Sequence, residues 1–168
     1  MSGRKFDIRV FVLFNVNNRK SIDVYMYDEF YVRTSSVAYS LKKKDVADCQ
    51  MHLTNDAVQN KSKKGKGQKS AYGQYEDANK LSMDEFGEYL KENCGCTENW
   101  IPDVLTKKLR EMVKVSGASV REKLNPKQRK HGFEMMGYDF MLDEKLNPWL
   151  IEVNSNPCLE MPCQLLGE

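Results

Sequence analysis

The stretch GYDFML at residues 137–142, followed after a polar loop by WLIEVN at residues 149–154, decides the fold of this chain. Both runs are short, apolar and rich in aromatic or β-branched residues, which is typical of strands. The loop between them, DEKLNP at residues 143–148, ends in Asn-Pro, a pair that favours a turn. We therefore predict a β-hairpin over residues 137–154.

The register of this hairpin follows from its turn. We assume that Leu142 faces Trp149 across the loop. The same register places Asp139 opposite Glu152. Asn154 then lies on the face of Glu152, because side chains two residues apart in a strand point to the same side. We call Asp139, Glu152 and Asn154 the hairpin trio.

The hairpin trio has the composition of a metal site. Carboxylates placed opposite each other destabilise a hairpin by charge repulsion, which a cation between them would relieve. Carboxylate and amide oxygens suit a hard ion such as Mg²⁺, and Mg²⁺ held by one or two carboxylates usually takes phosphates as further ligands. The alternatives are that both acids lie on a solvated face, although their neighbours are apolar, or that the register shifts by one residue.

The composition fits a globular protein. The chain has 168 residues, of which 40% are hydrophobic and 30% charged, enough for one domain with a core. Apolar runs stay far below the about 20 residues of a membrane helix, so no membrane partner is expected. Five cysteines in loose spacing predict reduced thiols rather than a zinc site, in keeping with a cytoplasmic location.

The N-terminal part predicts an antiparallel meander of three strands. Residues 6–14 alternate and place an apolar face toward a core, and residues 21–27 and 30–34 form the second and third strands. Asp28 and Glu29 would make the turn between the last two. Because a buried strand begins almost at once, we expect the chain to start within a fold.

Two helices are predicted in the second half. Ser82 and Glu85 form a capping box at the start of one helix, which ends near Gly95. Pro102 opens the next helix. Its expected inward-facing residues are Val104, Leu105, Leu109, Met112 and Val113.

A basic, glycine-rich segment at about 59–75 contains almost no large apolar residues, and we predict a flexible loop there. Its charge suits an acidic peptide or nucleic acid, and a solvated loop is the simpler interpretation. With only Tyr72 and Tyr75 available for stacking, nucleic acid is not an expected partner.

Five blocks, in order along the chain, resemble the tubulin–tyrosine ligase-like family. They are KFDIR at 5–9, RTS at 33–35, HLTN at 52–55, GYDFMLD at 137–143 and WLIEVN at 149–154. The resemblance implies the ATP-grasp fold. Residues 1–168 would then be the C-terminal part of an ATP-grasp domain, an α+β fold with an antiparallel sheet packed by helices, incomplete at its N-terminus.

The resemblance also implies roles for individual residues. It gives the hairpin trio the task of holding Mg²⁺, which agrees with the register argument. It places Lys5 and Asp7 along the ATP site and gives Thr54 and Asn55 contacts with the nucleotide. The expected cofactors are therefore ATP and Mg²⁺.

Arg9 and Arg33 would bind phosphate or the carboxylate to be activated, since a guanidinium fork binds either group in bidentate fashion. Family members are ATP-dependent ligases that attach an amino acid to a protein, usually tubulin, through an amide bond. We expect a free amino acid, glutamate or glycine rather than tyrosine, to reach the acidic tails of tubulin or microtubules through an acyl phosphate. The expected location is the cytoskeleton or a cilium.

Two other functions remain open at this point. The resemblance implies a first ATP-grasp half before residue 5, so the chain could be a truncated, non-catalytic module that binds nucleotide or an acidic protein tail. A weaker alternative is a nucleic-acid binder that uses the lysines of residues 61–69.

Overall fold

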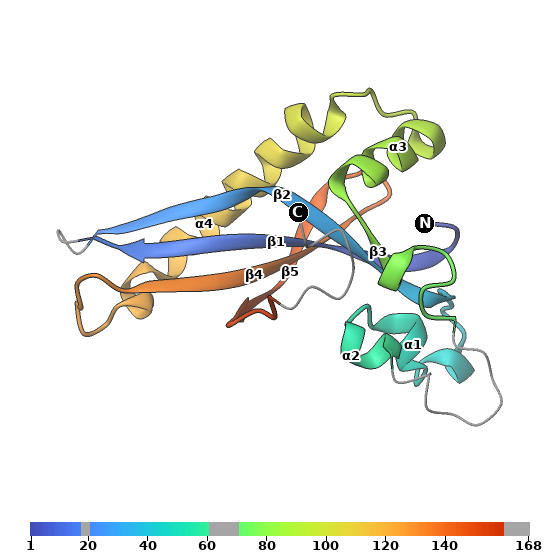
Figure 1. Ribbon diagram of the computed structural model, residues 1–168, viewed down its shortest axis with the longest axis horizontal. Helices are drawn as coiled ribbons and strands as arrows, with labels where there is room; N and C mark the ends of the chain where they lie inside the picture. The colour runs from blue at the N-terminus through green and yellow to red at the C-terminus, as the bar shows by residue number, and fades with distance from the viewer. Residues whose placement is uncertain (18–20, 61–70, 160–168) are drawn as a thin grey trace. The chain divides into compact units, whose positions relative to one another are not determined.

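The computed structural model describes residues 1–17, 21–60 and 71–159 (Figure 1). The described chain contains both helices and strands, and most of the helices lie between the β1–β2 and β4–β5 strand pairs, as expected for an α+β protein. The elements are β1 (Arg4–Val16), β2 (Ile22–Ala38), η1 (Lys43–Asp45), α1 (Cys49–His52), α2 (Asp56–Gln59), η3 (Asp77–Asn79), β3 (Lys80–Leu81), α3 (Met83–Cys94), η4 (Ile101–Leu105), α4 (Thr106–Leu124), β4 (Phe133–Leu142) and β5 (Pro148–Ser155). Most of the predicted loop at 59–75 lies outside the described residues.

The five strands form one sheet in the order β3-β2-β1-β4-β5. Strand β2 pairs antiparallel with β3, and β4 pairs antiparallel with β5. Strands β1 and β2 form a hairpin, since the N–H of Tyr39 donates to the carbonyl of Gly3 at 2.7 Å and the N–H of Asn17 donates to that of Ser21 at 3.1 Å. The predicted antiparallel sheet is confirmed.

The prediction of two strands at 21–27 and 30–34 is wrong, because β2 is a single strand of 17 residues. Asp28 and Glu29 continue the strand with exposed side chains instead of turning. Arg110 donates to the Asp28 carboxylate at 2.5 Å. An acidic pair favours a turn in isolation, but here a strand edge keeps both charges in solvent.

The described residues group into two compact units. Unit 1 is built mainly from Met1–Ile8 and Tyr31–Phe86, and unit 2 from Arg9–Phe30 and Gly87–Cys158. Strands β1 and β2 therefore contribute residues to both units.

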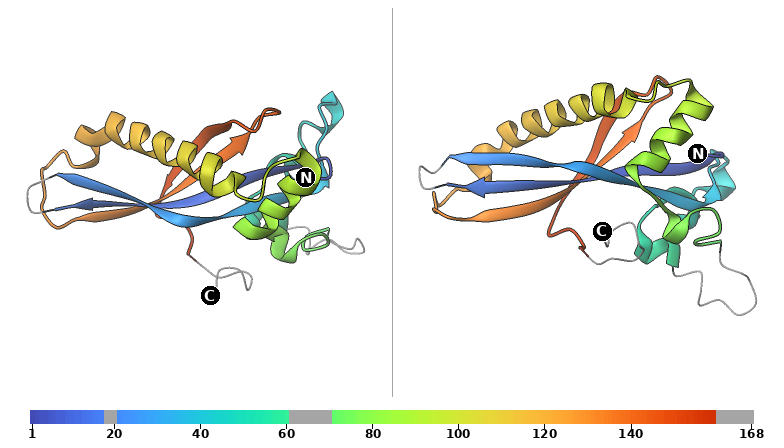
Figure 2. Two further views of the ribbon diagram at one scale, coloured as in Figure 1. Left: turned by 90° about the horizontal axis from the view of Figure 1, so that it is seen from above. Right: turned by 45° about the horizontal axis from the view of Figure 1, so that its top comes forward.

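In unit 2, helix α4 packs on the strands (Figure 2). Gly117 permits the close approach, because a Cβ at this position would lie 3.1 Å from the Phe14 ring and 3.7 Å from Val24. The predicted inward residues Leu105, Leu109 and Val113 are buried. The other two predicted residues, at positions 104 and 112, are only half-buried.

The capping box at the start of α3 is confirmed. The backbone N–H of Ser82 donates to the Glu85 carboxylate at 2.7 Å, and the N–H of Glu85 donates to the Ser82 hydroxyl at 3.1 Å. Gly95 follows the helix with a φ of +69°, a left-handed conformation that glycine adopts at low cost. Local sequence signals therefore set both ends of α3.

The four cysteines in the described ranges are free thiols, as predicted. Within those ranges, none of the helices combines the length and apolar character that crossing a membrane requires.

Candidate active site

The hairpin of β4 and β5 pairs Asp139 with Glu152, as predicted. The premise of that prediction was wrong, because Trp149 pairs with Met141 rather than with Leu142. The register shifts between Asp139 and Phe140, where one extra residue in β5 forms a β-bulge. Bulges commonly re-aim side chains next to functional sites.

The hairpin trio converges on one face of the sheet. The Asn154 amide donates to the Asp139 carboxylate at 3.2 Å and to the Glu152 carboxylate at 3.0 Å. Asp139 is buried, whereas the Glu152 side chain is exposed. The three groups therefore lead from the interior of unit 2 to its surface.

The cation that neutralises Asp139 is Arg9. Its Nε donates to Oδ1 of Asp139 at 2.5 Å and its Nη2 donates to Oδ2 at 3.0 Å, a bidentate pair. Both side chains are more than nine-tenths buried. Charge repulsion in the hairpin is thus offset by an arginine, a partner that the sequence analysis had assigned to phosphate or substrate carboxylate.

Gly137 makes room for this arginine. A Cβ at position 137 would lie 3.2 Å from Nη1 of Arg9 and 3.1 Å from the Cβ of Pro157. Both distances are tighter than an ordinary van der Waals contact. Glycine inside a strand often marks such a close approach, so the first residue of the GYDFML stretch has a packing role.

The hairpin trio fits a Mg²⁺ ion in the chemistry of its donors. Glu152 offers an exposed carboxylate, Asp139 keeps further lone-pair positions, and a half-turn of the Asn154 amide would present oxygen instead of nitrogen. Clusters of three or more His, Cys, Asp or Glu arranged for a metal do not occur in the described part of the chain. A Mg²⁺ ion here would need other ligands such as phosphates, which is how Mg²⁺ is commonly held.

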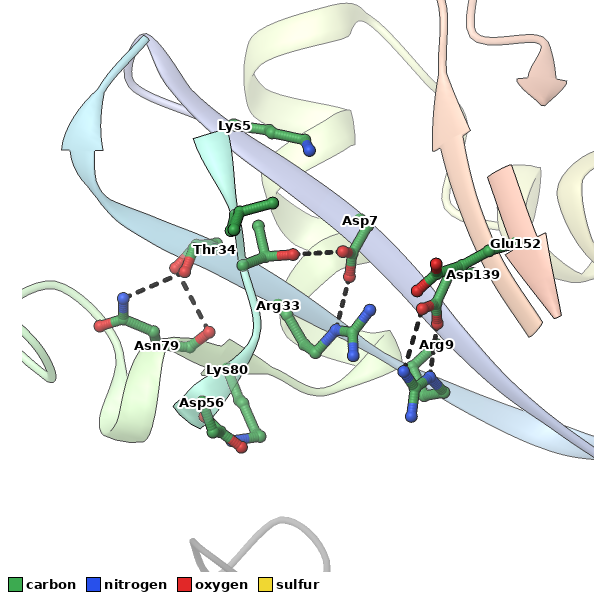
Figure 3. A network of polar contacts seen from close by, with 12 residues as sticks. Lys5, Asp7, Arg9, Arg33, Thr34, Asp56, Asn79, Lys80, Asp139 and Glu152 are labelled. Carbon is green, nitrogen blue, oxygen red and sulfur yellow. Dashed lines mark hydrogen bonds and ion pairs between the residues drawn. The ribbon is translucent and has the colours of Figure 1, made fainter. Parts of the chain in front are cut away.

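A second polar cluster, in unit 1, contains three more of the predicted site residues (Figure 3). Arg33 donates to Oδ1 of Asp7 at 2.7 Å, and the Thr54 hydroxyl donates to Oδ2 of Asp7. All three side chains are buried. The cluster joins β1 and β2 to the segment between α1 and α2.

The other two residues predicted for the nucleotide site lie at the rim of unit 1. The Lys5 ammonium donates to the backbone carbonyl of His52 at 2.6 Å. Asn55 is exposed and precedes α2 without a side-chain capping bond. The structure therefore brings Lys5 to the α1–α2 segment and leaves the Asn55 amide in solvent.

Sequence reasoning missed a buried lysine in unit 1. Lys80 is 2% exposed, and its ammonium donates to both oxygens of the Asp56 carboxylate at 2.8 and 2.6 Å. The Asp56 side chain is 40% exposed, so the pair reaches the surface. The available signal was weak, because Lys80 belongs to a strand of only two residues.

A further ion pair in unit 1 was also missed. Arg4 donates to both oxygens of the Glu76 carboxylate, and its guanidinium lies 4.2 Å from the centre of the Tyr75 ring. Thr34 donates to the same carboxylate at 2.9 Å. These contacts tie the segment before η3 to the start of β1.

Comparison with known proteins identifies the family. The family model described as Tubulin-tyrosine ligase family matches residues 1–167. The chain belongs to this family. It is similar to tubulin glycylase 3B of Tetrahymena thermophila, with 32% identity over 168 residues, and to the probable tubulin polyglutamylase TTLL9 of Bos taurus, with 31% identity over 166 residues. It is also 27% identical over 172 residues to the protein polyglycylase TTLL10 of Rattus norvegicus.

These matches cover nearly all of this chain and a small part of each relative. The alignments span 98–100% of the chain, but 13% of the glycylase, 32% of the polyglutamylase and 23% of the polyglycylase. The relatives' printed names describe modification of tubulin or protein with glycine or glutamate. The family is therefore shown for this chain, whereas the printed names describe the activities of the much longer relatives.

Proposed function

We propose that this chain forms part of an ATP-grasp ligase domain that attaches glutamate or glycine to an acidic protein tail, such as that of tubulin. The observation that carries the proposal is the convergence of the hairpin trio around a buried Arg9–Asp139 pair, with one exposed carboxylate. Family membership supports this class of reaction. A cytoskeletal or ciliary location would follow from a tubulin substrate.

Amide formation from a carboxylate needs a leaving group. Transfer of the γ-phosphoryl group of ATP to the carboxylate oxygen gives an acyl phosphate and ADP, and attack by the amine then releases phosphate. Bound Mg²⁺ would offset negative charge on the phosphates. The protein's part is to hold that charge in place: Glu152 and Asn154 bind and orient, while Arg9 fixes the Asp139 carboxylate.

Unit 1 would contribute to the nucleotide site. The Lys5 ammonium donates to the backbone carbonyl of His52, which lies two residues before Thr54 in the chain. The Asp7–Arg33–Thr54 cluster fixes the segment that contains Thr54 against β1 and β2. We infer that Lys5 and Asn55 contact the nucleotide, and that Asp7 and Thr54 position the backbone that carries them.

Binding and ligation test the proposal together. Titration of the chain with the non-hydrolysable analogue AMPPNP should give Mg²⁺-dependent binding that Glu152→Gln weakens at least about tenfold, roughly the loss of one charge-assisted ligand. Ligation is followed by ATP-dependent incorporation of radiolabelled glutamate or glycine into purified tubulin. Glu152→Gln should reduce incorporation by a similar or larger factor.

The matched control is Glu144→Gln, which makes the same charge change at an exposed position of the β4–β5 loop. It should bind and ligate like the unmodified chain. Mg²⁺-dependent binding without incorporation would support a nucleotide-binding module and reject the ligase. Equal binding by Glu152→Gln and Glu144→Gln would reject the proposed site itself.

A further inference from the structure

A groove in unit 2 shares no residue with the hairpin trio or with Arg9. It lies between β2 and α4 and has a volume of about 590 Å³. Its apolar residues on the strand are Ile22, Val24 and Met26. Its charged residues are Arg110, Lys114 and Arg121, all from α4, and the described residues that line it include no acid.

The three cations form one stripe on α4, because spacings of four and seven residues return to the same helix face. Arg110 pairs with Asp28 and Lys114 with Glu111, but all four side chains are at least half exposed. Exposed ion pairs contribute little to stability, so an incoming anion can compete with their acidic partners for these cations. Arg121 has no acidic partner among the residues that the structure describes.

The strand side of the groove is an open sheet edge. Strand β3 is the outer neighbour of β2, and it pairs only with Val32 and Arg33. In the described chain, the segment 22–29 of β2 therefore has no strand on its outer side. Tyr25 and Tyr27 are 57% and 59% exposed there. An open edge offers backbone N–H and C=O groups to an extended peptide.

We propose that this groove docks an extended acidic segment of another polypeptide, laid along β2 with its carboxylates on the three cations of α4. Charge complementarity with α4 favours this occupant, whose carboxylates must point away from the exposed Asp28 and Glu29 of the same strand. A second copy of the chain is disfavoured as the occupant. If two copies docked through the same sheet edge in an isologous contact, their identical basic stripes would face and repel each other. Docking extends the proposed function by holding an acidic protein at a surface separate from the hairpin trio, and it requires no nucleotide.

The test is fluorescence anisotropy with a fluorescein-labelled decaglutamate peptide, in the absence of nucleotide and Mg²⁺. The double variant Lys114→Glu/Arg121→Glu should lower the affinity at least about tenfold, with a salt dependence smaller than that of the unmodified chain. Lys123→Glu is the control, since it reverses one charge on α4 at an exposed residue outside the groove. It should change the affinity less than about twofold.

Circular dichroism checks that the variants fold. If the double variant Lys114→Glu/Arg121→Glu does not fold, Lys114→Gln/Arg121→Gln replaces it. Unchanged affinity in the double variant, or an equal loss in Lys123→Glu, overturns the proposal. Tighter binding of oligo(dT) that displaces the peptide identifies nucleic acid as the occupant and also overturns it. So does a dimer, seen by light scattering, that the double variant abolishes. Glu152→Gln should keep full affinity for the peptide, so a failure of the proposed nucleotide site can be told apart from a failure of the docking groove.

Discussion

A buried arginine–aspartate pair occurs in each of the two units, and the two pairs differ in the other groups that their aspartates contact. In unit 1, the second oxygen of Asp7 accepts from the buried hydroxyl of Thr54, so the Arg33–Asp7 pair closes inside the protein. In unit 2, Asp139 also accepts from Asn154, whose amide reaches the exposed Glu152. A closed pair is suited to hold segments together, whereas a pair linked to an exposed carboxylate is suited to hold a ligand.

The largest expected effect on stability comes from removing the aspartate of the Arg33–Asp7 pair. Asp7→Ala leaves the Arg33 guanidinium buried without its carboxylate, which should destabilise the chain by about 3–5 kcal/mol. Urea unfolding measures the change. The control Asp77→Ala, at an exposed position of unit 1, should stay within about 0.5 kcal/mol.

A double variant sharpens this prediction. Asp7→Leu/Arg33→Met removes both charges, and it should recover most of the lost stability because well-packed apolar residues often replace a buried ion pair. A double variant as unstable as Asp7→Ala would show that the cluster stabilises unit 1 by more than charge compensation.

A smaller effect is expected at the pair in unit 2. Gly137→Ala places a methyl group against the Arg9 guanidinium and Pro157, which should cost about 1–3 kcal/mol through overpacking. Because Arg9 must shift, Mg²⁺-dependent nucleotide affinity should fall as well. Gly132→Ala is the control, since a Cβ there meets no atom within 4 Å. A Gly137→Ala variant with unchanged stability would mean that Arg9 has room to move.

The smallest effect concerns Asp143, a half-buried residue whose carboxylate organises the β4–β5 loop. The backbone N–H of Asn147 and the Trp149 indole lower the pKa of Asp143 from 3.8 to about 2, with a further contribution from the N–H of Lys145. Because the folded pKa is below the unfolded one, this stabilisation is present above pH 3.8 and is lost as the pH falls toward 2.

Asp143→Asn should therefore be less stable than the unmodified chain near neutral pH, and the difference should shrink between about pH 4 and pH 2. Urea unfolding at several pH values measures it. A difference that does not change with pH would show that the carboxylate charge is not what holds the loop.

Local features were the ones that the sequence predicted well. The capping box of α3, the glycine at its end and the hairpin at 137–154 depend on residues a few positions apart, so their signals are contained in short windows. The failure at β2 has the same origin. Asp28 and Glu29 form a turn signal locally, and it is the pairing of β2 with β1 that keeps the strand continuous.

That Asp139 and Glu152 lie on neighbouring strands was predictable, because a short loop joins the strands. Their pairing was predicted from a wrong turn register, and the bulge compensates for that error of one residue. The bulge itself was not predictable, since no residue type marks it in the sequence. The role of Arg9 was not predictable either, because it depends on a contact across 130 residues of chain.

The most direct test of the central claim is the AMPPNP titration of the unmodified chain and of Glu152→Gln, each with Mg²⁺ and with EDTA. If the open pair in unit 2 holds a metal–nucleotide complex, Mg²⁺ should strengthen binding to the unmodified chain and Glu152→Gln should lose most of that gain. Binding that is the same in Mg²⁺ and EDTA, or a full Mg²⁺ effect in Glu152→Gln, would contradict the account.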